Sequence, residues 1–155
     1  MTYRKFIQDN LIKKQKPDFN QISQQIRRSL RDLDTAKANL RIDLTWSYTI
    51  SYHAMIRAGR ALMFSKGYLP TMKNSHKTIV EFTRMILGDK YKDITSSFNR
   101  MRRRRHDFIY DSKNHITNKE ASSSIEAAEK LINEIKSLIN KDNPQKEFFE
   151  LEVNW

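Results

Sequence analysis

The stretch LTWSYTISYHAMIRAGRALMFSK, residues 44–66, decides the fold. Its apolar side chains fall on most sides of a helix, which is typical of a helix that is buried nearly all round. Ala54, Ala58 and Ala61 leave room for a neighbouring helix to approach closely. Gly67 follows directly, and glycine commonly ends a helix in the left-handed conformation. We therefore predict a central, buried helix from Leu44 to Lys66.

One amphipathic helix is predicted before this central helix. Pro17 closes a basic N-terminal segment, residues 1–17, and Asp18 or Asn20 can cap the helix that follows. The charged residues of this helix fall largely off its apolar face, so it should pack on one side only. The apolar face consists of Ile22, Ile26, Leu30, Leu33 and Leu40.

Three more helices are predicted after the central one. Ser75 can cap a short helix that Gly88 ends, and a longer helix runs from about Tyr91 to Tyr110. Thr117 and Glu120 have the capping-box spacing that starts the last helix. Loops are predicted at Tyr68–Asn74 and Asp111–Ile116.

These helices predict an all-α fold, an antiparallel up-and-down bundle of about five helices. The bundle should cover residues 18–141, between the basic N-terminal segment and an aromatic C-terminal tail, residues 142–155. We expect Phe148, Phe149 and Trp155 of the tail to contact a protein surface, because apolar clusters are seldom left exposed to water. The tail can pack on the bundle or across a dimer, and the sequence does not decide between these alternatives.

The charge of the chain points to an anionic partner. The formal net charge is +11 and the pI is about 9.9. Such an excess is typical of proteins that bind nucleic acid, and an acidic protein is the second candidate. The simplest alternative is a soluble protein whose surface is merely charged.

Composition excludes several classes of site. The chain has no cysteine, which rules out disulfides and thiolate chemistry. His53, His76 and His115 have no partner at metal-ligand spacing, and no glycine-rich phosphate loop is present, so we predict neither metal nor cofactor. His53 is predicted to be a helix residue with a satisfied hydrogen bond, and Gly59 a site of close packing. Without a signal peptide or a membrane-length apolar stretch, we expect a cytoplasmic protein without membrane contact.

The strongest functional signal is the run RMRRRRH, residues 100–106. Its arginines repel one another on a helix, and the two nearby aspartates supply few counter-charges. Guanidinium groups match phosphate oxygens two at a time, so phosphates would balance the run. We therefore predict that Arg102, Arg103 and Arg104 bind nucleic acid. The alternative is a solvated cationic helix end.

His106 is a candidate acid or base on this helix. It lies four residues after Arg102 and four before Tyr110, so the three side chains share one drifting helix face. The neighbouring arginines disfavour its protonated form, which would suit a neutral base near neutral pH. The alternative is a surface histidine beside a tyrosine that only packs its ring.

Three segments of the chain resemble the HEPN domain family. They are SYHAMIRAGRALMFSKGY (residues 51–68), SHKTIVEF (75–82) and RRRRHDFIYD (102–111), and the resemblance spans about residues 42–139. It implies a helical bundle that forms a homodimer or a hetero-complex, with the motif ends meeting at a cleft between subunits. Many members pair with a minimal nucleotidyltransferase as a toxin–antitoxin system, and active members are metal-independent endoribonucleases.

The resemblance also implies a catalytic motif, in which an arginine precedes a polar residue and a histidine follows after a few positions. One register takes Arg105 as the arginine and His106 as the polar residue, which puts Tyr110 in the place of the histidine. A second register pairs Arg100 with His106, but Met101 is then not polar. We favour the first register, because the block RHDFIYD, residues 105–111, resembles the forms of the motif that end in a tyrosine. Tyrosine is a poorer base than histidine near neutral pH, so this register favours binding of RNA or a nucleotide over cleavage.

Three hypotheses follow for the function. The leading one is a dimeric HEPN-type domain that binds RNA or a nucleotide through its arginine helix, within a toxin–antitoxin pair. The second is an endoribonuclease in which His106 is the base or acid and the arginines stabilise the charge on the phosphate. The third is a non-enzymatic interaction module whose basic helix docks an acidic protein.

Overall fold

Most of the structure is helical, as the sequence predicts. The computed structural model describes residues 1–111 and 115–143. Within these ranges the elements are α1 (Tyr3–Gln8), β1 (Ile12–Lys14), α2 (Phe19–Asn39), α3 (Leu44–Ser65), β2 (Tyr68–Pro70), α4 (Ser75–Leu87), the 3-10 turn η1 (Asp89–Tyr91), α5 (Lys92–Tyr110) and α6 (Asn118–Asp142). The predicted all-α fold class is confirmed. None of the described helices combines the length and the apolar character that crossing a membrane requires. Most of the predicted aromatic tail, residues 144–155, lies outside the described residues.

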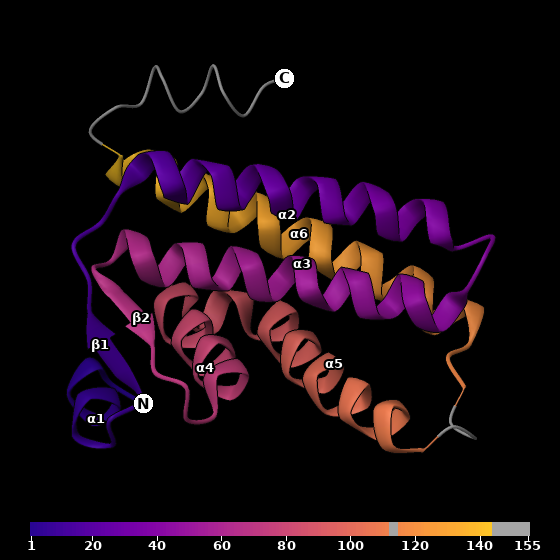
Figure 1. Cartoon of the computed structure of the whole chain (residues 1–155), viewed down its shortest axis with the longest axis horizontal. Helices are drawn as coiled ribbons and strands as arrows, with labels where there is room; N and C mark the ends of the chain where they lie inside the picture. Colours follow the sequence, from indigo (N-terminus) through magenta and orange to yellow (C-terminus); the bar gives the residue numbers. More distant parts are fainter. Residues whose placement is uncertain (112–114, 144–155) are drawn as a thin grey trace.

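The three longest helices lie side by side, and α3 is in the middle of the molecule (Figure 1). Helices α2 and α6 pack on one side of α3, and α4 and α5 pack on the other. α2 runs antiparallel to α3, as predicted. α6 runs in the same direction as α3, since Lys66 just after α3 pairs with Asp142 at the end of α6 at 2.7 Å. The predicted antiparallel arrangement does not extend to this pair, because α4 and α5 carry the chain back to the start of α3.

The central helix agrees closely with its prediction. α3 begins after Asp43, whose carboxylate accepts the backbone N–H of Trp46 at 3.0 Å. Gly67 follows the helix with a left-handed φ of 87°. Gly59 faces α4, because a Cβ at this position would come within 2.6 Å of Ile79 Cγ2. The predicted close packing at Gly59 is therefore confirmed, and it brings α4 directly onto α3.

The N-terminal segment folds onto the bundle. β1 pairs with β2 in antiparallel register, and Lys14 lies opposite Tyr68. Phe6 of α1 is fully buried, and its ring centroid is 5.6 Å from that of Phe82 in α4. The prediction of a loop starting at Tyr68 is therefore wrong for residues 68–70. Local sequence does not reveal this strand, because its partner lies far away along the chain.

The other helix starts mostly follow the predicted caps. The carboxylate of Asp18 caps α2, and Thr117 with Glu120 forms the predicted capping box of α6. The start of α4 differs, because Ser75 is the first helical residue and Asn74 precedes it with a left-handed φ of 50°. The prediction of Ser75 as the cap is wrong by one position. Asparagine tolerates the left-handed conformation better than most residues, which lets Asn74 take this place.

Candidate functional site

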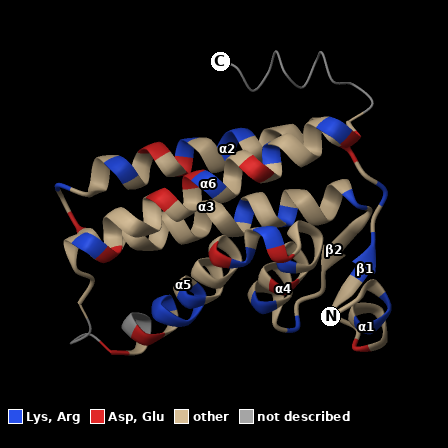
Figure 2. Ribbon diagram, turned by 180° about the vertical axis from the view of Figure 1, so that it is seen from behind, with Lys and Arg blue, Asp and Glu red and all other residues tan. Residues whose placement is uncertain are grey.

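The arginine run occupies the C-terminal half of α5, where basic residues gather on that helix (Figure 2). α5 packs on the bundle through Phe98 and Met101, both of which are buried. Arg105 follows Phe98 by seven residues and Met101 by four, so it continues this buried stripe. A charged side chain at a core-facing position needs polar partners, because burying an unpaired charge is costly. The groups around Arg105 therefore form a candidate binding site.

Helix geometry divides the run between two faces of α5. Successive residues turn by about 100° around a helix, so positions three or four apart share a face. Arg103 lies between the faces and is exposed. The α6 face of α5 consists of Arg100 and Arg104, and the α4 face consists of Arg102, Arg105 and His106.

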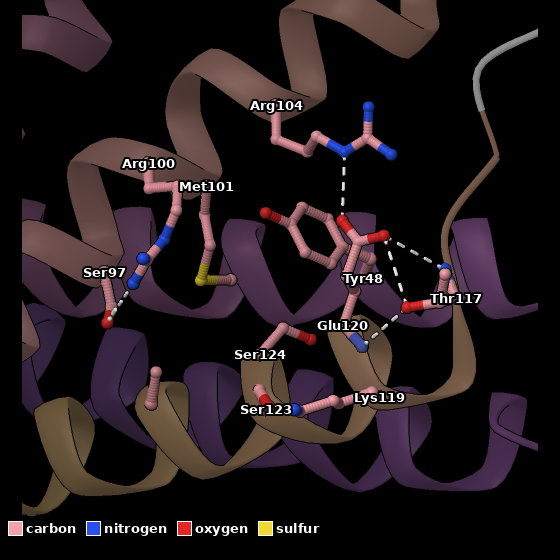
Figure 3. Close-up of a pocket in the computed structure, with 11 residues that line it drawn as sticks. Tyr48, Ser97, Arg100, Met101, Arg104, Thr117, Lys119, Glu120, Ser123 and Ser124 are labelled. Carbon is pink, nitrogen blue, oxygen red and sulfur yellow. Dashed lines mark hydrogen bonds and ion pairs between the residues drawn. The ribbon is translucent and has the colours of Figure 1, made fainter.

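On the α6 face, Arg104 is held by acceptors within the protein. Its Nε donates to Glu120 Oε2 at 3.1 Å, and its Nη2 donates to the carbonyl of His115 at 2.8 Å. Glu120 also accepts the backbone N–H of Thr117, so it lies between Arg104 and Thr117 (Figure 3). Burial acts to raise the pKa of Glu120, but the hydrogen bonds from Arg104 and Thr117 outweigh it and lower that pKa. Arg104 therefore ties α5 to the start of α6.

The α6 face also borders a pocket of about 360 Å³ that Tyr48 and Arg100 help to line (Figure 3). Arg100 donates a hydrogen bond to Ser97 Oγ at 3.0 Å. Burial and the charge of Glu120 raise the pKa of Tyr48 to about 12, against the opposing effects of Arg104 and Arg100. Tyr48 therefore remains a neutral hydroxyl near neutral pH.

The α4 face borders a cleft of about 550 Å³ between α3, α4 and α5. The guanidinium carbon of Arg105 lies 5.8 Å from the ring centroid of Tyr52, which is a cation–π distance. The Nε of Arg105 is buried and has no hydrogen-bond partner among the described residues. No ion pair to an arginine of this face is found in those residues either. The cleft is lined by Tyr52, His76, Arg102, Arg103, Arg105, His106 and Asp107.

Two histidines from different helices meet beside Arg105. The hydroxyl of Tyr52 lies 2.9 Å from Nδ1 of His76, and the ring centroids of His53 and His76 are 6.3 Å apart. Burial lowers the pKa of both imidazoles, and the charge of Arg105 lowers it further. Burial also raises the pKa of Tyr52. At neutral pH the cleft therefore presents the neutral imidazole of His76 and a neutral phenol beside charged guanidinium groups.

The structure brings some of the predicted site residues together and separates others. Arg102 and His106 line the same cleft, and the ring centroid of Tyr110 lies 4.7 Å from that of His106. Tyr110 itself is 78% exposed. Arg100 lines the pocket on the α6 face, away from the cleft that contains His106 and Arg105. The second register, Arg100 with His106, therefore pairs residues from different faces of α5.

The sequence does not predict Tyr52, His53 or His76 as site residues. We expected a satisfied hydrogen bond for His53, but its imidazole contacts the rings of Tyr52 and His76 and has no hydrogen-bond partner in the part of the chain that the structure describes. One feature of the sequence points towards these residues. Arg105 continues the buried stripe of Phe98, so its side chain must contact residues of another helix. The described residues contain no group of three His, Cys, Asp or Glu side chains that could hold a metal ion.

Comparison with known families finds one match, the HEPN domain, over residues 22–138. No curated protein and no solved structure matches the chain. The matched residues contain α3, α4 and α5 in full, and therefore both faces of the arginine helix, whereas α1 and β1 lie outside the match. The match covers most of the chain and agrees with the resemblance seen in its sequence. The chain belongs to the HEPN domain family, a family of nucleotide-binding helical domains.

Proposed function

We propose that the chain binds the phosphate groups of RNA or of a nucleotide in the cleft on the α4 face of α5. The observation that carries this proposal is the surplus of cationic groups there. Arg102, Arg103 and Arg105 line the cleft, and no ion pair to them is found among the described residues. The net charge of +11 supports the same reading, because it favours polyanions at long range.

The position of Arg105 supports a bound ligand more strongly than exposed arginines would. Its Nε is buried without a hydrogen-bond partner in the described ranges. A buried donor that is left unpaired costs roughly 1–3 kcal/mol, and more where the group is charged. A phosphate oxygen can accept from a guanidinium group at two positions and would remove this cost.

RNA binding at several salt concentrations tests the proposal. The full chain is titrated with a fluorescent single-stranded RNA, and the affinity should fall steeply as salt rises. The double variant Arg102→Gln/Arg105→Gln should bind at least about tenfold more weakly, with a salt slope smaller by roughly 2. Arg4→Gln is the matched control, because Arg4 is an exposed arginine of α1, and α1 contributes no residue to the lining of the cleft. Equal binding by the double variant and the control would contradict the proposal.

A ribonuclease is the second candidate function, favoured by the position of His106. This histidine lines the same cleft as Arg102 and Arg105, so a phosphate held by the arginines would lie near an imidazole. RNA cleavage in the presence of a chelator, lost in His106→Ala and kept in Tyr110→Phe, would support it. Binding without cleavage would leave the leading function alone.

The proposed partners come from the family. We propose a homodimer, a minimal nucleotidyltransferase as the partner in a toxin–antitoxin pair, and a cytoplasmic location. The mass of the chain in solution, measured by light scattering, tests the dimer, and co-purification with a nucleotidyltransferase encoded beside it tests the pair. If neither RNA nor nucleotide binds at low salt, a module that docks an acidic protein is the function that remains.

A further inference from the structure

The cleft has an inner wall that the arginine helix does not supply. Tyr52 of α3 and His76 of α4 line this wall, and His53 of α3 contacts the ring of His76 but is not a lining residue. The phenol of Tyr52 is fully buried, and its hydroxyl contacts Nδ1 of His76 at 2.9 Å. His53 lies with its ring edge-on to that of His76, at a centroid distance of 6.3 Å. The imidazole of His76 therefore lines the same cleft as Arg105, which packs over Tyr52.

One ring nitrogen of His76 remains for a ligand. Nδ1 is engaged with the hydroxyl of Tyr52, and His76 lines the cleft. Nε2 is therefore the atom of this imidazole that a bound group can reach. When His76 is protonated, both nitrogens are donors, so Nε2–H can donate to an anion while Nδ1–H donates to Tyr52. The contact with Tyr52 fixes the ring in either protonation state.

The charges around the imidazole pair are unbalanced. The single carboxylate among the charged groups that act on the pair, Asp32, already pairs with Arg28 at 3.2 Å and with Arg57 at 3.1 Å. Asp107 and His106 also border the cleft, on the side of α5. The charged groups that act on the imidazoles are Asp32 from α2, Arg57 and Arg60 from α3, and Arg102 and Arg105 from α5.

We propose that His76 forms the inner wall of a phosphate site whose outer wall is Arg102 and Arg105, that His53 supports His76 through their ring contact, and that binding a phosphate group there takes up protons. This inference rests on the proposed function, which concerns the arginines alone, and adds two residues and a dependence on pH. In the free chain, arginine charges and burial keep the imidazoles neutral. A phosphate group in the cleft supplies negative charge close to both imidazoles, so it favours their protonated forms and can accept a hydrogen bond from His76, which lines the cleft.

Because phosphate binding favours the protonated imidazoles, the affinity for phosphate depends on pH. Both pKa values are lowered in the free chain, so the imidazoles are neutral near pH 7 and charge only in more acidic solution. A bound phosphate raises the pKa of any imidazole that it contacts. Affinity should therefore rise as pH falls, by up to about tenfold for each histidine whose pKa rises by one.

Histidine titrations by NMR test the proposal on the unaltered chain. The titration midpoints of all four histidines are measured in the free protein and in the protein saturated with ligand. One arm uses an oligouridylate without terminal phosphates, and the other uses uridine 5′-phosphate, which separates an RNA strand from a free nucleotide as the source of the phosphate. The midpoint of His76 should rise by about one pH unit with at least one ligand, with a smaller rise for His53. That of His115, an exposed residue after α5, should not move.

Variants give the second measurement. Between about pH 8 and pH 5.5, wild-type affinity for the oligouridylate should rise about tenfold or more. The double variant His53→Asn/His76→Asn should lose most of this rise, and His115→Asn should keep it, provided that thermal unfolding shows both to be folded. If RNA binds but the midpoints of His53 and His76 stay unchanged, or if His106→Asn alone abolishes the pH dependence, this inference is wrong and the proposed function stands. If no ligand binds at either pH, both fail.

Discussion

The two faces of α5 present the same kind of side chain to opposite surroundings. On the α6 face, Arg104 meets the carboxylate of Glu120 and a backbone carbonyl. On the α4 face, Arg105 meets the ring of Tyr52 and the neutral imidazole of His76 beside it, and no acidic partner is found among the described residues. Both guanidinium groups are charged at any ordinary pH. The first guanidinium group is neutralised within the protein, and our proposal is that a bound phosphate neutralises the second.

This difference shows that consecutive arginines on one helix do not form a single cationic surface. A helix distributes consecutive residues around its axis, so neighbours in the run reach different helices. Arg104 binds the first turn of α6, where it supports the connection that follows α5. We infer that the pattern in the sequence combines a structural arginine with a ligand-binding set.

The largest loss of stability should come from a variant that disturbs the packing of α4 on α3 and leaves the α6 face of α5 unaltered. Gly59→Ala places a methyl group 2.6 Å from Ile79 Cγ2 and 3.0 Å from Thr83 Oγ1, so α4 must move away from α3. Overpacking of this kind should lower the free energy of unfolding by about 2–3 kcal/mol, and RNA affinity should fall because His76 moves with α4. Urea unfolding measures the first effect, with the exposed Ser122→Ala of α6 as the control. Unchanged stability would mean that α4 does not pack as closely as the structure shows.

The second prediction concerns Tyr48, beside the α6 face of α5, and the stability of the protein at alkaline pH. The pKa of Tyr48 is raised to about 12, so its hydroxyl ionises in the unfolded chain first. Stability that is present below about pH 10 should therefore be lost as pH rises towards 12, by roughly 2 kcal/mol from this residue. Tyr48→Phe should flatten the fall in urea-unfolding free energy over this window. Tyr110→Phe, at an exposed position, should leave it unchanged, and a matching effect of the two variants would refute the assignment.

A variant of the α6 face should affect stability more than RNA binding, and a variant of the α4 face should affect RNA binding more than stability. Arg104→Gln should lower the free energy of unfolding by about 1 kcal/mol, because a partly buried ion pair and a hydrogen bond to a carbonyl are lost. Arg102→Gln should change stability by less than about 0.5 kcal/mol, since within the described residues Arg102 bonds to Asn99 on its own helix and to no other residue. RNA affinity should respond in the opposite order. Chemical unfolding measures the stability of both variants, and RNA titration measures their affinity. If the same variant shows the larger loss in both assays, the two faces do not differ in role.

The smallest effect concerns acid. The lowered pKa of Glu120 contributes stability that is present above its ordinary value near 4.5 and is lost as pH falls through the lowered value. Glu120 is about a third exposed, so solvent screening should keep this contribution below about 1 kcal/mol. Unfolding free energies from about pH 6 to pH 3 should show a shallower fall in Arg104→Gln than in wild type. The exposed Glu126→Gln serves as the control and should follow wild type.

Local signals in the sequence predict most of the fold. The central helix, the left-handed Gly67 and the capping box of Thr117 with Glu120 depend on residues that are close together along the chain. β1 and β2 escape prediction, because each has three residues and is fixed by pairing and by the packing of Phe6 under α4. Propensity and periodicity report neither of these contacts.

The candidate site is predictable only in part, for the same physical reason. The arginine run and His106 stand out on one helix, and the place of Arg105 on the stripe of Phe98 could have marked it as buried. The meeting of His53 with His76 depends on how α3 crosses α4, which Gly59 permits. No spacing along the chain encodes that crossing.

The pairing of β1 with β2 has a consequence for the order of synthesis. On the ribosome, Ile12–Lys14 emerge long before their partners at Tyr68–Pro70, so the first strand must wait until the hairpin of α2 and α3 has been made. The contact closes a long loop and should therefore form late. β2 leads directly into α4, so the segment made first is anchored next to the helix that carries His76. A nascent chain halted before Tyr68 would have every residue of its first strand and nothing for that strand to pair with.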